Sequence, residues 1–90
     1  MTDSAINTYY DANCVRTVDA RGLRCPLPLL KAKQQLNGLA PGQQLQVLAT
    51  DSASVKDFHA FVNLSCHRLA AFEQAGEVYR YLLVKGAETE

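Results

Sequence analysis

The chain has 90 residues, 48% hydrophobic and 20% charged, which is the composition of an ordinary globular protein and the length of one domain. Nine basic and nine acidic residues give a formal net charge of zero, which argues against a nucleic-acid binder that depends on a basic surface. No apolar run approaches the roughly 20 residues of a membrane-spanning helix, so membrane insertion is not expected.

The cysteines and the first residues indicate a cytoplasmic protein. Met1-Thr2-Asp3-Ser4 lacks the basic and then apolar pattern of a secretory signal. Three cysteines, an odd number without a Cys-x-x-Cys pair, do not suggest a disulfide scaffold. A reducing compartment therefore suits this chain.

Residues 1–13 are polar and carry no periodicity, so we expect a disordered or loosely docked tail. Residues 14–90 should then form a single domain. Its first element is a strand over residues 14–19, which are rich in β-branched side chains.

A helix is predicted from Pro26 to about Asn37. Its apolar residues recur at the spacing of one helical face, and Gly38 is expected to end the helix at its C-terminus. The predicted apolar stripe is Leu29, Ala32, Leu36 and Leu39.

The second half of the chain predicts a strand, a helix and two further strands. Residues 45–49 form the strand, and residues 51–54 offer several N-caps for the helix. The apolar stripe predicted for that helix is Val55, Phe58, Val62 and Cys66. Strands at residues 69–73 and 78–85 follow, joined by a connection of hairpin length at residues 74–77.

The stretch from Arg21 to Pro28 joins the first strand to the first helix, and it contains a thiol. Proline is favoured in the first turn of a helix, so Pro26 and Pro28 predict that the helix starts there with Cys25 as its N-cap. Since neither proline has an N–H group, the Leu27 amide is the donor expected to point toward the Cys25 sulfur.

A helix N-terminus favours anions, so a cysteine there tends toward a lowered pKa and a larger thiolate fraction. Arg21 and Arg24 add positive charge nearby, and Lys33, two turns further on, should add only a weak effect. These three residues could also dock an acidic partner surface. The alternatives are that Cys25 is only a small capping residue and that the basic side chains are simply solvated.

Structural roles are expected for three of the residues that precede Cys25. Asp19 is expected to hydrogen-bond turn amides at the end of the first strand. Gly22 is expected in a backbone conformation closed to other residues. Leu23 is expected to pack on the first turns of the helix.

The remaining cysteines and histidines favour structural roles. Cys66 is read as a buried, inert thiol, with a resolving cysteine for Cys25 as the alternative. The sequence offers no argument for a functional role of Cys14. His67 and the adjacent Cys66 lack the spacing of a zinc site that would include Cys25, so no metal is expected. His67 is interpreted as a helix-terminal residue, and His59 as a structural residue near the edge of the second helix's stripe.

Residues 19–28, Asp-Ala-Arg-Gly-Leu-Arg-Cys-Pro-Leu-Pro, resemble the signature of the TusA/SirA-like sulfur carriers. Further matching positions are Lys33, Leu36, Pro41-Gly42, Asp51, His67 and Tyr79-Arg80-Tyr81. The resemblance covers about residues 15 to 86. Leu27 departs from the acidic residue that the tRNA-thiolation member has between its two prolines.

The resemblance implies that Cys25 accepts a sulfane sulfur as a persulfide and passes it to a partner. A cysteine desulfurase or rhodanese-like enzyme would be the donor, an acceptor sulfur-relay protein would follow, and no cofactor would be needed. The sulfur could serve tRNA thiolation or related sulfur metabolism.

The order strand-helix-strand-helix-strand-strand indicates an α+β fold, in which right-handed crossovers advancing in one direction place both helices on one face. The resemblance implies a two-layer α/β sandwich of βαβαββ order, with a four-stranded mixed sheet ordered 1-2-4-3.

Two other functions stay open at this point. One is a non-catalytic regulatory or transporter-associated binding module, which slow alkylation of Cys25 would favour. The other is an RNA-binding protein of similar fold, against which the zero net charge counts.

Overall fold

The computed structural model describes residues 14–87, and the tail predicted at residues 1–13 lies outside them. The described residues form four strands and two helices. Their bounds are β1 Cys14–Ala20, α2 Leu27–Asn37, β2 Gln44–Ala49, α3 Ala53–Asn63, β3 Arg68–Ala75 and β4 Val78–Val84. The predicted order of the elements is confirmed.

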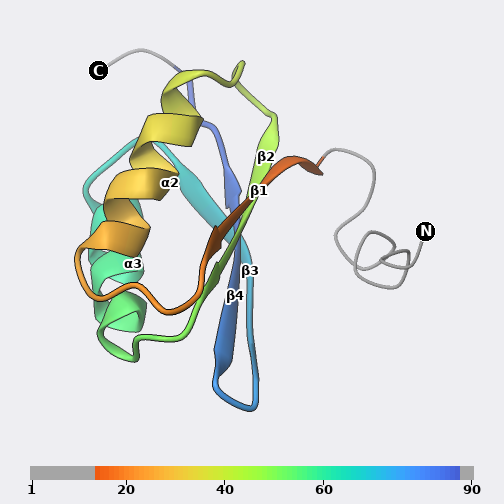
Figure 1. Cartoon of the computed structure of the whole chain (residues 1–90). Helices are drawn as coiled ribbons and strands as arrows, with labels where there is room; N and C mark the ends of the chain where they lie inside the picture. The colour runs from red at the N-terminus through yellow and green to blue at the C-terminus, as the bar shows by residue number, and fades with distance from the viewer. Residues whose placement is uncertain (1–13, 88–90) are drawn as a thin grey trace.

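The strands form one mixed sheet in the order β1-β2-β4-β3, as expected. β1 is parallel to β2, and β4 is antiparallel to both of its neighbours. Both helices cover the same face of the sheet, which makes a two-layer sandwich (Figure 1). β4 is an interior strand of the sheet, and its last four residues, Tyr81 to Val84, are all buried.

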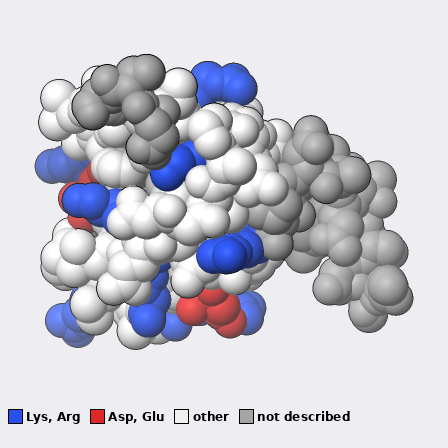
Figure 2. All heavy atoms as spheres, turned by 90° about the horizontal axis from the view of Figure 1, so that it is seen from above, with Lys and Arg blue, Asp and Glu red and all other residues white. Residues whose placement is uncertain are grey.

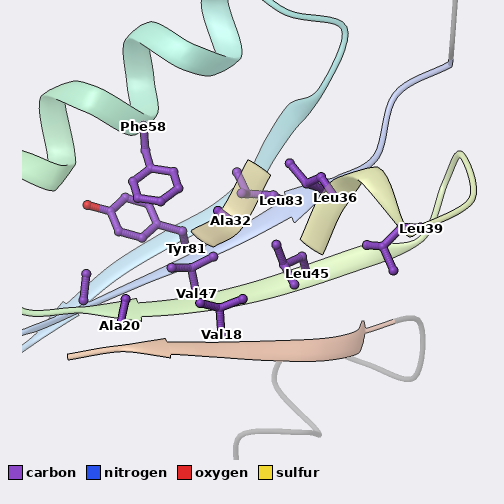
Figure 3. Packing of buried hydrophobic residues seen from close by; sticks show 11 residues of the cluster. Val18, Ala20, Ala32, Leu36, Leu39, Leu45, Val47, Phe58, Tyr81 and Leu83 are labelled. Carbon is purple, nitrogen blue, oxygen red and sulfur yellow. The ribbon is translucent and has the colours of Figure 1, made fainter. Parts of the chain in front are cut away.

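The core lies between the helices and the covered face of the sheet. Alternate residues of β2 point into it, since successive side chains of a strand face opposite sides. The Phe58 ring from α3 stacks on Tyr81 from β4 with 4.3 Å between ring centroids. Figure 3 shows these rings together with Leu36 and Ala32 from α2. Fully burying one such large apolar side chain is worth about 1.5–3 kcal/mol.

The apolar residues predicted for the first helix pack inward as expected, although Leu39 lies beyond the end of α2 at Asn37. Ala32, Leu36 and Leu39 are buried, and Leu29 packs half-buried against the core. Gly38 ends α2, as predicted, and its N–H group donates to the last carbonyls of the helix. Neither helix of the described residues has the length and apolar content needed to cross a membrane.

The stripe predicted for the second helix is confirmed only in part. Phe58 is fully buried, and Val55 and Val62 are half-buried. Cys66 is outside α3 and exposed, so its prediction as a buried helical residue was wrong. The reason is that α3 ends at Asn63, before the next inward position of the helical period is reached.

Candidate functional site

The turn before α2 differs from the prediction. The Cys25–Pro26 peptide bond is cis, and the Leu27 amide donates to the Arg24 carbonyl oxygen at 2.8 Å. This hydrogen bond from the fourth residue to the first closes a four-residue turn over residues 24–27. Cys25 is therefore the second residue of this turn, and the N-cap of α2 is Pro26 instead of Cys25. The helix begins at Leu27, with Pro28 buried as its second residue.

The Leu27 amide does not point to the Cys25 sulfur, because the turn uses it for the bond to Arg24. The expected N–H donor to the thiol was therefore wrong. The Leu27 side chain is 46% exposed, and Leu30, one turn further along α2, is 45% exposed. These two side chains give the start of α2 an apolar outer surface.

The thiol of Cys25 is exposed and donates a hydrogen bond to Oδ2 of Asp57 on α3. This bond raises the pKa of Cys25, and the negative charges of Asp57 and Asp51 act in the same direction. The expectation of a lowered pKa was therefore wrong. The physical reason is that a nearby carboxylate disfavours the thiolate, and α3 brings one into contact with the sulfur.

Asp51 fixes the backbone of this turn. Its Oδ2 accepts a hydrogen bond from the Cys25 N–H at 2.6 Å, and its Oδ1 accepts one from Ala53, the first residue of α3, at 3.1 Å. The bond from Cys25 is the main reason why the pKa of Asp51 is lowered, and the charge of Arg24 contributes. One carboxylate thus joins the turn before α2 to the start of α3.

Arg21 is paired with Asp19 and does not contact the thiol. Its Nε and Nη2 each lie 2.8 Å from an Asp19 carboxylate oxygen, and its backbone N–H also donates to Asp19. These bonds lower the pKa of Asp19 to about 2. The prediction that Asp19 binds a turn amide is confirmed.

Gly22 has φ +85°, the left-handed region that favours glycine, as predicted. Its N–H donates to the Thr50 hydroxyl at 2.9 Å, which ties the loop after β1 to the end of β2. Leu23 is half-buried and packs against the core. These contacts hold the loop that carries Cys25 against the end of the sheet.

A groove of about 460 Å³ opens between α2 and α3, and we call it the α2–α3 groove. Its lining is Leu29, Lys33, Asp57, Ala60, Phe61, Leu64 and Ser65. Asp57 therefore contacts the thiol and also lines the groove. Lys33 lies with its Nζ 5.7 Å from the centroid of the Phe61 ring, and Leu64 is 87% exposed.

Asp57 and Leu64 were not singled out from the sequence. An acidic residue in the first half of a helix and a leucine at its end are common, so neither carries a local signal. Only the packing of α3 beside the turn before α2 gives them a place near the thiol.

Cys66 and His67 lie after the C-terminal end of α3, whereas Cys25 contacts Asp51, which precedes α3, and Asp57 in the first half of α3. The structure does not bring the two thiols together. His67 is in the loop before β3, not at a helix end, and its Nδ1 accepts a hydrogen bond from the Gly86 N–H. Residues 14–87 contain no group of three His, Cys, Asp or Glu side chains that could hold a metal.

Comparison with known proteins assigns the family. The family model described as Sulfurtransferase TusA matches residues 16–85. The chain is 46% identical over 68 residues to the sulfur carrier protein TusA of Allochromatium vinosum, covering 76% of this chain and 90% of that one. It is 38% identical over 71 residues to the putative sulfur carrier protein YrkF of Bacillus subtilis, covering 79% of this chain but 38% of that protein.

A solved structure agrees with these sequence matches. The crystal structure of a SirA-like protein from Desulfitobacterium hafniense superimposes with a TM-score of 0.70 at 26% identity, covering 81% of this chain and all of that one. The family match extends from β1 past the end of β4 and includes the turn that carries Cys25. The chain therefore belongs to the TusA family of sulfurtransferases.

Proposed function

We propose that this protein carries sulfur as a persulfide on Cys25, accepting it from a donor protein and passing it to an acceptor protein. The observation that supports this most directly is the exposed Cys25 thiol within the family motif. In the loading step, the Cys25 thiolate attacks the outer sulfur of a donor persulfide. The donor cysteine leaves as a thiolate, and Cys25 then carries the outer sulfur.

The delivery step repeats the same chemistry in the opposite direction. An acceptor thiolate attacks the outer sulfur on Cys25, and Cys25 leaves as a thiolate. Because both substrates are borne by proteins, no enclosed pocket and no cofactor are required. A cysteine desulfurase or rhodanese-like enzyme would be the donor, and the acceptor would decide whether the sulfur reaches tRNA thiolation or another branch of sulfur metabolism. Repeated use of reduced thiols suits the cytoplasm.

The surface around Cys25 suits protein docking. Leu27 and Leu30 expose apolar surface on α2, and Leu64, which lines the α2–α3 groove, does so after α3. Exposed apolar side chains grouped beside a reactive atom are a common feature of interaction surfaces. Arg24, exposed beside the thiol, and Lys33, in the groove, supply positive charge to the same surface.

Intact-mass spectrometry tests the proposal. Incubation with a cysteine desulfurase and cysteine should add one sulfur atom to the protein, and reduction with dithiothreitol should remove it. Cys25→Ser should abolish the gain, while Cys66→Ser, which leaves the motif thiol in place, should load normally. A loaded Cys25→Ser protein, or no loading of the native chain by any persulfide donor, would contradict the proposal.

A non-catalytic binding module is the second candidate, and the hydrogen bond from Cys25 to Asp57 favours it. Because the raised pKa leaves little thiolate in the free protein, slow alkylation alone no longer separates the two functions. Sulfur loading does separate them, since a binding module needs no persulfide. An RNA-binding role has less support: the formal net charge is zero, and in Figure 2 the Lys and Arg side chains of that face lie at separate places.

A further inference from the structure

The charged groups near Cys25 come from several parts of the fold. Asp57 on α3 contacts the sulfur, and Asp51, before α3, contacts the backbone of the same residue. Arg24 is the preceding residue, and its charge acts on Asp51. Lys33 on α2 lines the groove that Asp57 also lines. Arg21 lies four residues before Cys25 and is bonded to Asp19.

Asp57 is the charged side chain in direct contact with the reacting atom. A carboxylate that accepts the S–H hydrogen stabilises the neutral thiol, and its charge disfavours the thiolate. Sulfur exchange requires the thiolate as the attacking group. The free protein therefore holds its sulfur-accepting atom in the less reactive protonation state, and efficient loading requires that the charge of Asp57 be neutralised.

We propose that Asp57 is a positioning residue that keeps Cys25 as a neutral thiol in the free protein, and that a basic side chain of the docking partner pairs with Asp57 and releases the thiolate. This inference rests on the proposed sulfur-carrier function. Asp57 is partly exposed and lines the α2–α3 groove, so a cation from a docked protein can reach it. The carrier then becomes reactive chiefly in the complex with its partner.

The loading step balances under this inference. The Cys25 proton is released as the partner's cation pairs with Asp57. The new Cys25–sulfur bond forms as the sulfur–sulfur bond of the donor breaks. The departing donor thiolate takes up one proton. Cys25 thus ends as the persulfide, and the donor cysteine ends as the thiol.

The first test is the pH profile of Cys25 alkylation by iodoacetamide. The full chain carries Cys14→Ser and Cys66→Ser, so that Cys25 alone is labelled. Asp57→Asn removes the charge and keeps the side-chain shape, while Glu77→Gln removes the same charge in the turn between β3 and β4. The quantity compared is the midpoint of the pH profile of the alkylation rate. A rate at a single pH would mislead, because a more acidic thiol is also intrinsically less nucleophilic.

Asp57→Asn should shift the midpoint to lower pH and raise the thiolate fraction at neutral pH by about two- to fivefold, the effect of one exposed charge interaction. Asp57→Ser should shift it in the same direction, and Glu77→Gln should leave it unchanged. An Asp57→Asn protein with a native circular dichroism spectrum and an unchanged midpoint would overturn the inference.

The second test examines the basic partner group with two small disulfides. Cystamine carries ammonium groups, and dithiodiglycolate carries carboxylates. In the native chain, Cys25 should react faster with cystamine, and the ratio of the two rates should fall about two- to fivefold in Asp57→Asn. The preference should also weaken near 1 M salt, where the screening length is only about 3 Å. A rate ratio that does not depend on Asp57 would refute pairing with a partner cation.

The two proposals can fail separately. If the native chain loads sulfur but Asp57→Asn leaves the pH profile unchanged, this inference fails and the carrier function stands. If the profile shifts but no persulfide donor loads Cys25, the carrier function fails and the effect of Asp57 on the thiol stands.

Discussion

Asp51 accepts a hydrogen bond from the backbone N–H of Cys25 across a sequence separation of 26 residues, with 2.6 Å between nitrogen and oxygen. The same carboxylate accepts the N–H of Ala53, at the start of α3. The loop that carries the thiol and the helix that carries Asp57 therefore share one anchor. The position of the sulfur relative to Asp57 depends on this link.

Replacing Asp51 should loosen this anchor. Asp51→Ala removes the acceptor of both N–H groups and should lower the melting temperature by several degrees. Asp51→Asn keeps one carbonyl oxygen, so its melting temperature should lie between those of the native chain and Asp51→Ala. Thermal unfolding followed by circular dichroism measures this order, and equal melting temperatures for all three proteins would show that the anchor contributes nothing.

The pair between Asp19 and Arg21 predicts a pH dependence of stability. The pKa of Asp19 falls from 3.8 to about 2 in the folded protein, because Arg21 hydrogen-bonds its carboxylate. A lowered folded-state pKa contributes stability above the unfolded pKa, and that contribution is lost as the pH falls toward the folded value. Both side chains are more than half exposed, so the effect should be small.

Denaturant unfolding of the native chain and of Asp19→Asn measures this dependence. The free energy of unfolding of the native chain should exceed that of the variant at about pH 5, and the difference should shrink toward about pH 2. A difference that stays constant over this range would mean that the pair does not contribute through the ionisation of Asp19.

The hydrogen bond between Ser54 and Tyr81 should contribute to stability, because both side chains are fully buried and their oxygens lie 2.7 Å apart. Ser54→Ala leaves the Tyr81 hydroxyl without this partner and should cost about 1–3 kcal/mol in the free energy of unfolding. Tyr81→Phe should cost a similar amount. The double variant should lose less than the sum of the two single variants, and strict additivity would indicate that the bond does not couple them.

Two glycines should respond to alanine for different physical reasons. At Gly22 an added Cβ meets nothing within 4 Å. Gly22→Ala should therefore lower the free energy of unfolding only because alanine disfavours the left-handed conformation, which costs roughly 1–2 kcal/mol. At Gly86 an added Cβ would overlap the Cys66 carbonyl group, so Gly86→Ala requires the backbone to move. Equilibrium unfolding should show a clearly larger loss for Gly86→Ala, and the reverse order would contradict this account.

The order of the elements could be predicted from the chain because its signals are local. The spacing of Ala32, Leu36 and Leu39 follows the helical period, and Gly38 stops the helix. Glycine at position 22 reflects a backbone conformation that other residues rarely adopt. The strand order 1-2-4-3 came from the resemblance to the TusA/SirA-like proteins, since several orders satisfy the same local pattern.

The state of the thiol could not be predicted in this way. The sequence placed Cys25 at the start of a helix, where its surroundings were expected to favour the anion. Tertiary structure placed Cys25 in a turn before that helix and brought Asp57 to it from 32 residues away. A hydrogen bond between distant residues depends on how α2 and α3 pack on the sheet, and no local pattern of residues encodes that distance.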